Sequence, residues 1–281
     1  MVAISKVTLS QRGKLLDIIR KTRRVVVKIG SSVLADKEGG LSHRALLGIA
    51  REIAVIQQRG VHLILVSSGA IASGMHYLGF EKKPRRIEQL QACAAIGQPI
   101  LVQFYQKALA RTKLQVAQVL LTRSDLEDRK RFLNARRTLT ELLQRGVIPI
   151  INENDTVVVE EIRVGDNDNL AALVTHLVDA DLLILLTDQD GFHTADPRQH
   201  RSAAPIRFVE NLNREAFARA SDTRKAISVG GMRTKLEAAQ KVARFGIPTL
   251  IANGRDPKIL KRLFAAEEVG TLLLPPQRKK T

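Results

Sequence analysis

The sequence predicts an α/β fold, a three-layer α/β/α sandwich with a mainly parallel central sheet. Short β-branched and leucine-rich runs such as "VVVKI" and "LLILL" indicate strands that are covered on both faces. Segments with helical apolar spacing separate these runs, so the strands are joined by crossovers that make them parallel and place helices on both faces. With 281 residues and no linker-like segment, the chain is expected to form one main domain.

The strands and helices alternate along most of the chain. We expect strands within 23–30, 61–70, 114–121, 147–151, 181–188, 247–252 and 269–274. We expect helices within 41–60, 87–112, 125–145, 169–180, 231–246 and 256–266. Ser42 can cap the first of these helices, Gly60 ends it, and Pro99 is expected to bend or split the second. Residues 157–164 alternate well enough for a hairpin arm or an edge strand.

The composition is basic and poor in aromatic residues. The formal net charge is +17, tryptophan is absent, and aromatic residues make up 4%. Several aromatic platforms for base stacking are therefore not available, and specific nucleic-acid binding is not expected. We interpret the basic segments at 12–24, 81–86, 128–137 and 277–280 as solvated faces; nonspecific nucleic-acid binding is the alternative.

The two ends of the chain are basic, and the chain has a single cysteine. Residues 1–23 form a basic extension, interpreted as a leading surface helix, with an organellar transit segment as the alternative. Residues 275–281 form a basic tail. No apolar run approaches the roughly 20 residues of a membrane span. Cys93 excludes an intrachain disulfide, suits a reducing cytoplasm, and is expected to be a buried structural thiol rather than a nucleophile.

The polar motifs follow the predicted strands, at the edge of the sheet where ligands bind in this fold class. "KIGSS", "SSGA", "INEND" and "LLTDQDG" all lie there. Lys28 ends a buried strand, so it either pairs with an acid or contacts a phosphate together with Gly30 and the amides of Ser31 and Ser32. "SSGA" is either a tight strand–helix junction or a carboxylate site that uses Ser68 and backbone amides.

Residues 151–170 concentrate negative charge and amides in a basic protein. The acidic residues are Glu153, Asp155, Glu160, Glu161, Asp166 and Asp168. A solvated hairpin and a polar binding surface are both compatible with this composition. Further along, "TDQDG" makes either a turn or part of a nucleotide site. In "GGMRTK", Lys235 at a helix start opposes the helix dipole, which a bound polyanion would explain; a flexible loop is the alternative.

Together these motifs resemble the amino acid kinase family, and within it the branch that phosphorylates the side-chain carboxylate of glutamate. The resemblance runs from about Arg24 to about Leu274, which we take as the kinase domain, 24–274. "INEND" followed by "VGDNDNL" is its most specific part. The family loop usually reads GTGGM, whereas this chain has "SVGGM", with Ser228 and Val229 in place of glycine and threonine. Relatives often carry a C-terminal RNA-binding-type (PUA) domain, for which we expect no room here.

The resemblance implies roles for particular residues. Lys28 and Lys235 resemble the two lysines that contact the ATP phosphates, and Asp168 the carboxylate that orients them. Asp166 and Glu153 would support the site. The glutamate-binding positions correspond to Ser68, Asp155 and Asn167. The nucleotide-binding positions correspond to Lys28, Thr187, Asp188, Val229, Gly230, Gly231, Met232, Arg233, Thr234 and Lys235. Asp155 would pair with the α-ammonium, and Asn154, Asn167 and Asn169 would supply neutral donors and acceptors, while Glu160 and Glu161 are expected at the surface.

The implied activity is ATP-dependent formation of γ-glutamyl phosphate, the first step of proline biosynthesis. ATP and Mg²⁺ are implied, without an assignable protein ligand for the metal. The resemblance also implies a homo-oligomer, dimer or tetramer, a cytoplasmic location, and functional coupling to glutamate-5-semialdehyde dehydrogenase. Two alternatives stay open at this point: an enzyme of the same fold with a different acceptor, and a non-catalytic regulatory or nucleic-acid-binding protein.

Overall fold

A single sheet forms the centre of the molecule. The computed structural model describes residues 8–36, 40–158, 167–210, 212, 216–217 and 231–276. Within these ranges the strand order is β3-β4-β2-β1-β5-β7-β8-β6. The strands are β1 (Arg24–Ile29), β2 (His62–Ser67), β3 (Val116–Leu121), β4 (Ile148–Glu153), β5 (Leu182–Thr187), β6 (Phe208–Val209), β7 (Thr249–Asn253) and β8 (Thr271–Leu273). Neighbouring strands from β3 to β7 are parallel, and β8 runs antiparallel to β7.

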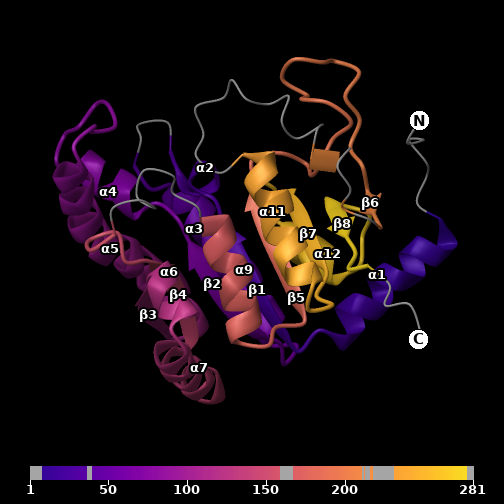
Figure 1. Ribbon diagram of the computed structural model, residues 1–281, viewed down its shortest axis with the longest axis horizontal. Helices are drawn as coiled ribbons and strands as arrows, with labels where there is room; N and C mark the ends of the chain where they lie inside the picture. The colour runs from indigo at the N-terminus through magenta and orange to yellow at the C-terminus, as the bar shows by residue number, and fades with distance from the viewer. Residues whose placement is uncertain are drawn as a thin grey trace.

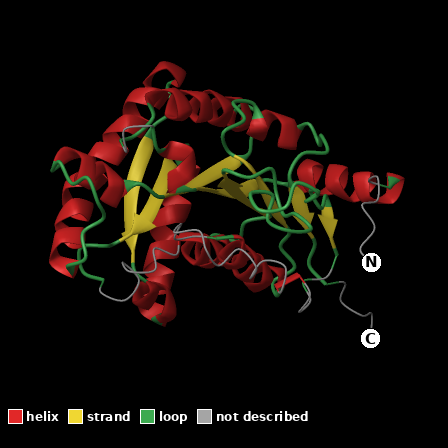
Figure 2. Cartoon of the chain, turned by 90° about the horizontal axis from the view of Figure 1, so that it is seen from above, coloured by secondary structure: helices red, strands yellow, loops and turns green. Residues whose placement is uncertain are grey.

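Helices cover both faces of this sheet (Figures 1 and 2). The described helices are α1 (Leu9–Lys21), α2 (Ser31–Leu34), α3 (His43–Gln57), α4 (Ala70–Tyr77), α5 (Ile87–Leu109), α6 (Arg123–Glu127), α7 (Arg129–Gln144), α9 (Asn167–Leu177), α11 (Met232–Ala243) and α12 (Ile259–Phe264). The apolar residues of α1, α3, α5 and α12 form one buried cluster with the sheet, and those of α7, α9 and α11 form a second cluster on the opposite face. The predicted three-layer α/β/α fold is confirmed.

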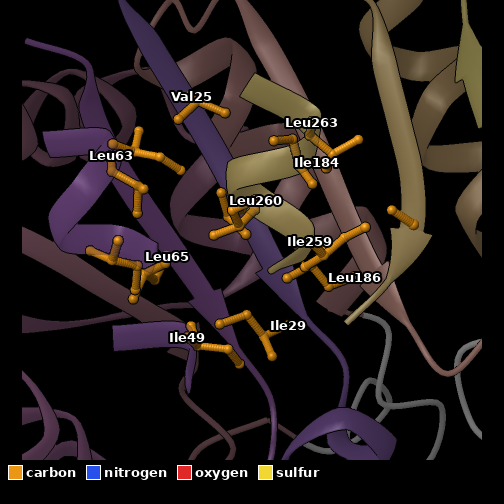
Figure 3. Packing of buried hydrophobic residues seen from close by; sticks show 14 of the residues in the cluster. Val25, Ile29, Ile49, Leu63, Leu65, Ile184, Leu186, Ile259, Leu260 and Leu263 are labelled. Carbon is orange, nitrogen blue, oxygen red and sulfur yellow. The ribbon is translucent and has the colours of Figure 1, made fainter. Parts of the chain in front are cut away.

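The central strands are apolar on both sides because each face is covered. In β1, Val25 and Ile29 belong to the first buried cluster and Val26 to the second. Figure 3 shows the first cluster at close range, where side chains of β1, β2 and β5 meet Leu260 and Leu263 of α12. Burying one such side chain contributes about 1.5–3 kcal/mol. The continuous apolar runs in the sequence thus reflect burial from two sides.

Two predicted helices differ in detail from the sequence-based expectation. α5 runs through Pro99 as one helix, so the predicted split there is wrong. The helix expected within 125–145 is instead two helices, because the side chain of Asp128 accepts a hydrogen bond from the Arg131 amide at 2.8 Å and caps a new helix start. α2 and β6 were not predicted, since four and two residues are too short to show a period.

The basic extension contributes to the core where the structure describes it. Thr8 caps α1 in a capping box with Gln11. Leu15 and Ile19 of the same helix are buried in the first apolar cluster. The predicted leading helix therefore packs on the sheet layer. Most of the predicted hairpin arm, residues 159–164, and the tail from residue 277 lie outside the described residues. Among the helices that the structure describes, none has the length and apolarity needed to span a bilayer.

α4 and α5 lie unusually close together, through glycines. A Cβ atom on Gly74 would lie 1.9 Å from the carbonyl oxygen of Cys93, and one on Gly97 would lie 1.8 Å from that of Ala70. Real side chains do not approach backbone atoms so closely, so only glycine fits at either position. Cys93 is buried at this contact, as predicted, and burial raises the pKa of its thiol. The contact fixes the course of α5 around Pro99.

This close contact predicts that glycine-to-alanine substitutions at two positions change the free energy of unfolding in opposite directions. Gly97→Ala should lower the free energy of unfolding by roughly 1–3 kcal/mol or more, because the new methyl group overlaps the Ala70 carbonyl. Gly48→Ala in α3, where the new methyl group would meet no atom within 4 Å beyond its own chain neighbours and helix backbone, should raise it by roughly 0.5–1 kcal/mol. Urea unfolding measures both; equal stability of Gly97→Ala and the wild type would contradict the close α4–α5 contact.

Candidate active site

The ends of four parallel strands bring the polar motifs to one edge of the sheet. The register pairs Ile29 of β1 with Ser67 of β2 and with Leu186 of β5, and β4 continues the alignment beyond β2. The residues brought to this edge are Lys28, Ser68, Asn152 and Thr187. The sequence-based expectation that the motifs share one edge is therefore confirmed.

One buried carboxylate holds two buried lysines. Asp168, in the first turn of α9, is 1% exposed, while Lys28 and Lys235 are 5% and 3% exposed. The Nζ atom of Lys28 lies 2.8 Å from Oδ1 of Asp168, and the Nζ atom of Lys235 lies 3.1 Å from Oδ2. Thr234 also donates its hydroxyl to Oδ2, at 2.7 Å. The two ammonium groups, far apart in the sequence, thus converge on a single acid.

The electrostatics of this cluster keep Asp168 ionised. Burial alone would raise the pKa of Asp168, but the charges of Lys28 and Lys235 and hydrogen bonds from Lys28 and Thr234 lower it to about 2. Burial lowers the pKa of Lys235, with Asp168 opposing the shift. The cluster thus brings two buried ammonium groups together at the edge of the sheet. Buried positive charge of this kind favours the approach of an anion.

The nucleotide-binding positions predicted in α11 divide into two groups. Gly231 begins the helix without a side-chain cap, and Thr234 and Lys235 face Asp168. Arg233 instead pairs with Glu237 on the exposed surface, and Met232 packs against the second apolar cluster. Only the backbone, Thr234 and Lys235 of this stretch therefore face the lysine–aspartate cluster. The predicted positions Val229 and Gly230 lie outside the described residues, as does Asp166.

Two further segments lie at the same edge of the sheet: the residues at the end of β5 and the turn that follows β1. The hydroxyl of Thr187 lies 3.3 Å from Oδ1 of Asp188, and Oδ2 of Asp188 pairs with Arg198 at 2.8 Å. Asp188 also contributes to the field at Lys235. The Gly30 amide donates to the carbonyl of Leu186, so it does not point at an anion as the sequence had suggested.

On the other side of α9 a polar chain runs inward from the sheet edge. Nδ2 of Asn167 donates to Oγ of Ser68 at 2.9 Å and to Oδ1 of Asn152 at 3.0 Å. Nδ2 of Asn152 donates in turn to Oε1 of Gln98, in α5, at 2.9 Å. Gly69, next to Ser68, has φ 111°, a left-handed conformation that favours glycine and turns the chain sharply into α4. Ser68 and Asn167, both predicted to bind substrate, are therefore in direct contact.

Asp155 lies in the turn that follows β4, and no described hydrogen bond joins it to the lysine cluster. It is half-buried, and burial raises its pKa to about 6, with the charge of Lys83 opposing the shift. Glu153 is buried at the end of β4. Asn154 accepts from the Thr156 hydroxyl at 2.6 Å. Asp155 is thus a partly exposed carboxylate in the field of a nearby lysine.

Other expectations concern the rest of the acidic stretch. Oδ1 of Asn169 accepts a hydrogen bond from Lys241 of α11. Glu160 and Glu161 lie outside the described residues. Sequence reasoning missed Asn152 and Gln98, whereas Thr234 was among the predicted nucleotide-binding positions. Gln98 could have been noticed as a lone amide in the otherwise apolar run "ACAAIGQPILV".

Comparisons with known proteins agree with this geometry. The family model described as "Amino acid kinase family" matches residues 23–253. Glutamate 5-kinase of Geobacter metallireducens is 53% identical over 92% of this chain and 69% of its own length. Glutamate 5-kinase of Azoarcus sp. is 52% identical over the same shares.

Two solved structures share the fold at low sequence identity. UMP kinase of Bacillus anthracis has a TM-score of 0.59 at 19% identity, covering 90% of this chain and 96% of its own. Isopentenyl phosphate kinase of T. acidophilum has a TM-score of 0.58 at 16% identity, covering 89% and 99%. Because the family model spans most of the sequence and the curated relatives are about half identical to it, this chain belongs to the amino acid kinase family, beside its glutamate 5-kinase relatives.

Proposed function

We propose that the chain transfers the γ-phosphoryl group of ATP to the side-chain carboxylate of glutamate, giving γ-glutamyl phosphate and ADP, the first step of proline biosynthesis. The observation that carries the proposal is the pair of buried lysines on Asp168. The glutamate 5-kinase relatives, about half identical over 92% of the chain, support the choice of acceptor. Domain bounds of 24–274 are part of the same proposal.

The acceptor needs no general base. The side-chain carboxylate of glutamate has an ordinary pKa of about 4.3 and is already an anion at neutral pH. One of its oxygens attacks the γ-phosphorus, the bond to the β,γ-bridging oxygen breaks, and ADP leaves with that bond's electron pair. The barrier comes from bringing an anion to a polyphosphate, so alignment and charge neutralisation must supply the catalysis.

The lysine cluster has the charge that this step requires. Lys28 and Lys235 would contact phosphate oxygens, while Asp168 keeps both ammonium groups in place. The uncapped start of α11 at Gly231 would add backbone amides toward the polyanion. Because the cluster is buried, each of these interactions is stronger than it would be in water.

Magnesium enters the proposal with the nucleotide. Among the described residues, no three carboxylate, imidazole or thiol groups lie close enough to hold a metal ion together. Mg²⁺ favours phosphate oxygens and water, with at most one or two carboxylates. We therefore propose that it is held chiefly by ATP, where it neutralises phosphate charge, with no protein ligand named.

The polar chain on the other side of α9 would hold glutamate. Asp155 would pair with the α-ammonium, and Ser68 and Asn167 would face carboxylate oxygens. Asn167 and Asp168 are consecutive at the start of α9, and each contacts a different set of partners. The acceptor and the triphosphate would then meet at the start of one helix.

Three further expectations belong to the proposal. β3 ends the sheet and its apolar side chains, apart from that of Leu121, are only half-buried, which supports a homo-oligomer, dimer or tetramer, formed through an edge. The single cysteine suits the cytoplasm as the location. Acyl phosphates hydrolyse readily, which supports functional coupling to a consuming enzyme such as glutamate-5-semialdehyde dehydrogenase.

The acceptor can be identified by trapping the product. With ATP, Mg²⁺, glutamate and hydroxylamine, the chain should form a hydroxamate in proportion to ADP, because an acyl phosphate reacts with hydroxylamine. Phosphorylation of a different kind of acceptor would give ADP without hydroxamate. Absence of any glutamate-dependent ATP turnover, together with nucleic-acid binding that weakens steeply with salt, would favour the non-catalytic alternative.

Lys235 should act in turnover rather than in glutamate binding. Lys235→Ala is expected to lower kcat roughly 10²- to 10³-fold with little change in the glutamate KM, because the missing charge faces the transferring phosphoryl group. Lys241→Ala, an exposed lysine of the same helix, is the matched control and should keep wild-type kcat. Unchanged turnover in Lys235→Ala would remove this residue from the mechanism.

Asp155 should act in glutamate binding and in its pH dependence. Asp155→Ala is expected to raise the glutamate KM roughly 10- to 100-fold and to leave the ATP KM nearly unchanged. Since the pKa of Asp155 is about 6, its carboxylate gains a proton as the pH falls through that value, and the glutamate KM should rise there. Steady-state kinetics from pH 5 to 8 measure this; Asp155→Asn should lose the rise. Equal effects on both KM values would contradict the assignment.

A further inference from the structure

The side-chain amide of Gln98 is buried, and only one of its two polar atoms has a described hydrogen-bond partner. Gln98 is 6% exposed, its Oε1 accepts from Asn152, and its Nε2 has no hydrogen-bond partner among the described residues. A buried amide nitrogen without a partner is destabilising. An apolar residue of similar length would avoid that cost, so the presence of glutamine points to a role for its other atom, Oε1.

The hydrogen bonds from Gln98 outward have a single direction. Oε1 of Gln98 can only accept, so Asn152 must present Nδ2 to it and Oδ1 to the other side. That Oδ1 accepts from Nδ2 of Asn167, whose second hydrogen is directed to Oγ of Ser68. The carbonyl of Ser67, which can only accept, lies 3.4 Å from the same nitrogen, at the limit of a hydrogen bond, and favours the same orientation of Asn167. At the buried end, Oε1 of Gln98 supplies the acceptor that matches this direction.

The direction decides what Ser68 offers to a ligand. Because its oxygen accepts from Asn167, the hydroxyl proton of Ser68 is left to donate. A donated proton suits a carboxylate oxygen. If Asn152 and Asn167 both turned over, Asn167 would present its oxygen to Ser68, and the hydroxyl proton would be used inside the protein. The lone pairs of Ser68 would then face the ligand and repel a carboxylate.

We propose that Gln98 is a positioning residue that, through Asn152 and Asn167, sets the hydroxyl of Ser68 as a donor to a carboxylate of glutamate. The inference rests on the proposed function and deepens it. Gln98 touches neither the lysine cluster nor the predicted ATP positions in any described contact, so its effect is confined to the amino acid. The unpaired Nε2 is the cost of placing an acceptor at this depth.

Two substitutions separate the acceptor from the rest of the side chain. Gln98→Met keeps the length and removes both polar atoms, so Asn152 is free to turn over. Gln98→Glu keeps an oxygen acceptor for Asn152 whether the carboxyl is ionised or protonated. Gln106→Met, at an exposed position of the same helix, is the matched control.

Steady-state kinetics with hydroxamate detection give the expected pattern. Gln98→Met should raise the glutamate KM about 10- to 100-fold, with the ATP KM within about twofold of wild type, which also shows that the protein is folded. Gln98→Glu should recover most of the loss, and Gln106→Met should match wild type. A wild-type glutamate KM in Gln98→Met, an equal rise in both KM values, or no recovery in Gln98→Glu would each overturn the proposal. Absence of hydroxamate from the wild-type chain would instead overturn the proposed function.

Discussion

The ion pairs of Asp168 with Lys28 and Lys235 are the interaction on which the site depends. They join the end of β1, the start of α9 and the start of α11, three segments that are distant in the sequence. A buried lysine is tolerable only with a counter-charge, and here one carboxylate serves two. The carboxylate gathers two ammonium groups from separate segments at one buried place, an arrangement that suits the proposed binding of a polyanion.

The first turn of α9 links the two halves of the site. Asp168 faces the lysines, whereas the preceding residue, Asn167, faces Ser68 and Asn152. Consecutive residues at a helix start point in different directions, so one rigid element sets the distance between the proposed phosphate side and the proposed amino-acid side. The close approach of α4 and α5 through Gly74 and Gly97 places Gln98 behind this arrangement. The packing of α4 on α5 is therefore connected to Ser68 through the hydrogen bonds of Gln98, Asn152 and Asn167.

Much of this was predictable from the sequence, for physical reasons. The apolar runs of β1 and β5 predict strands covered on two faces, and polar residues after them predict a ligand edge. Lys28 and Lys235 were identifiable because a charge at a buried strand end and a lysine at a helix start both conflict with local rules. Functional sites are where such conflicts are expected.

The remainder depends on contacts that no local pattern encodes. Asn152 and Gln98 are 54 positions apart and meet only because α5 packs beside β4. The continuity of α5 through Pro99 accompanies its packing on α4, and the contact between Asn169 and Lys241 depends on the packing of α11 beside α9. The spacing of residues in a helix predicts which side chains share a face. The residues that this face contacts are set by the tertiary structure.

A crystal structure of the chain with glutamate, Mg²⁺ and a non-hydrolysable ATP analogue tests the central claim most directly. The account predicts that the ammonium groups of Lys28 and Lys235 both contact phosphate oxygens, at roughly 2.7–3.2 Å, while each remains on Asp168. A triphosphate bound elsewhere, with both lysines still satisfied by Asp168 alone, would contradict it.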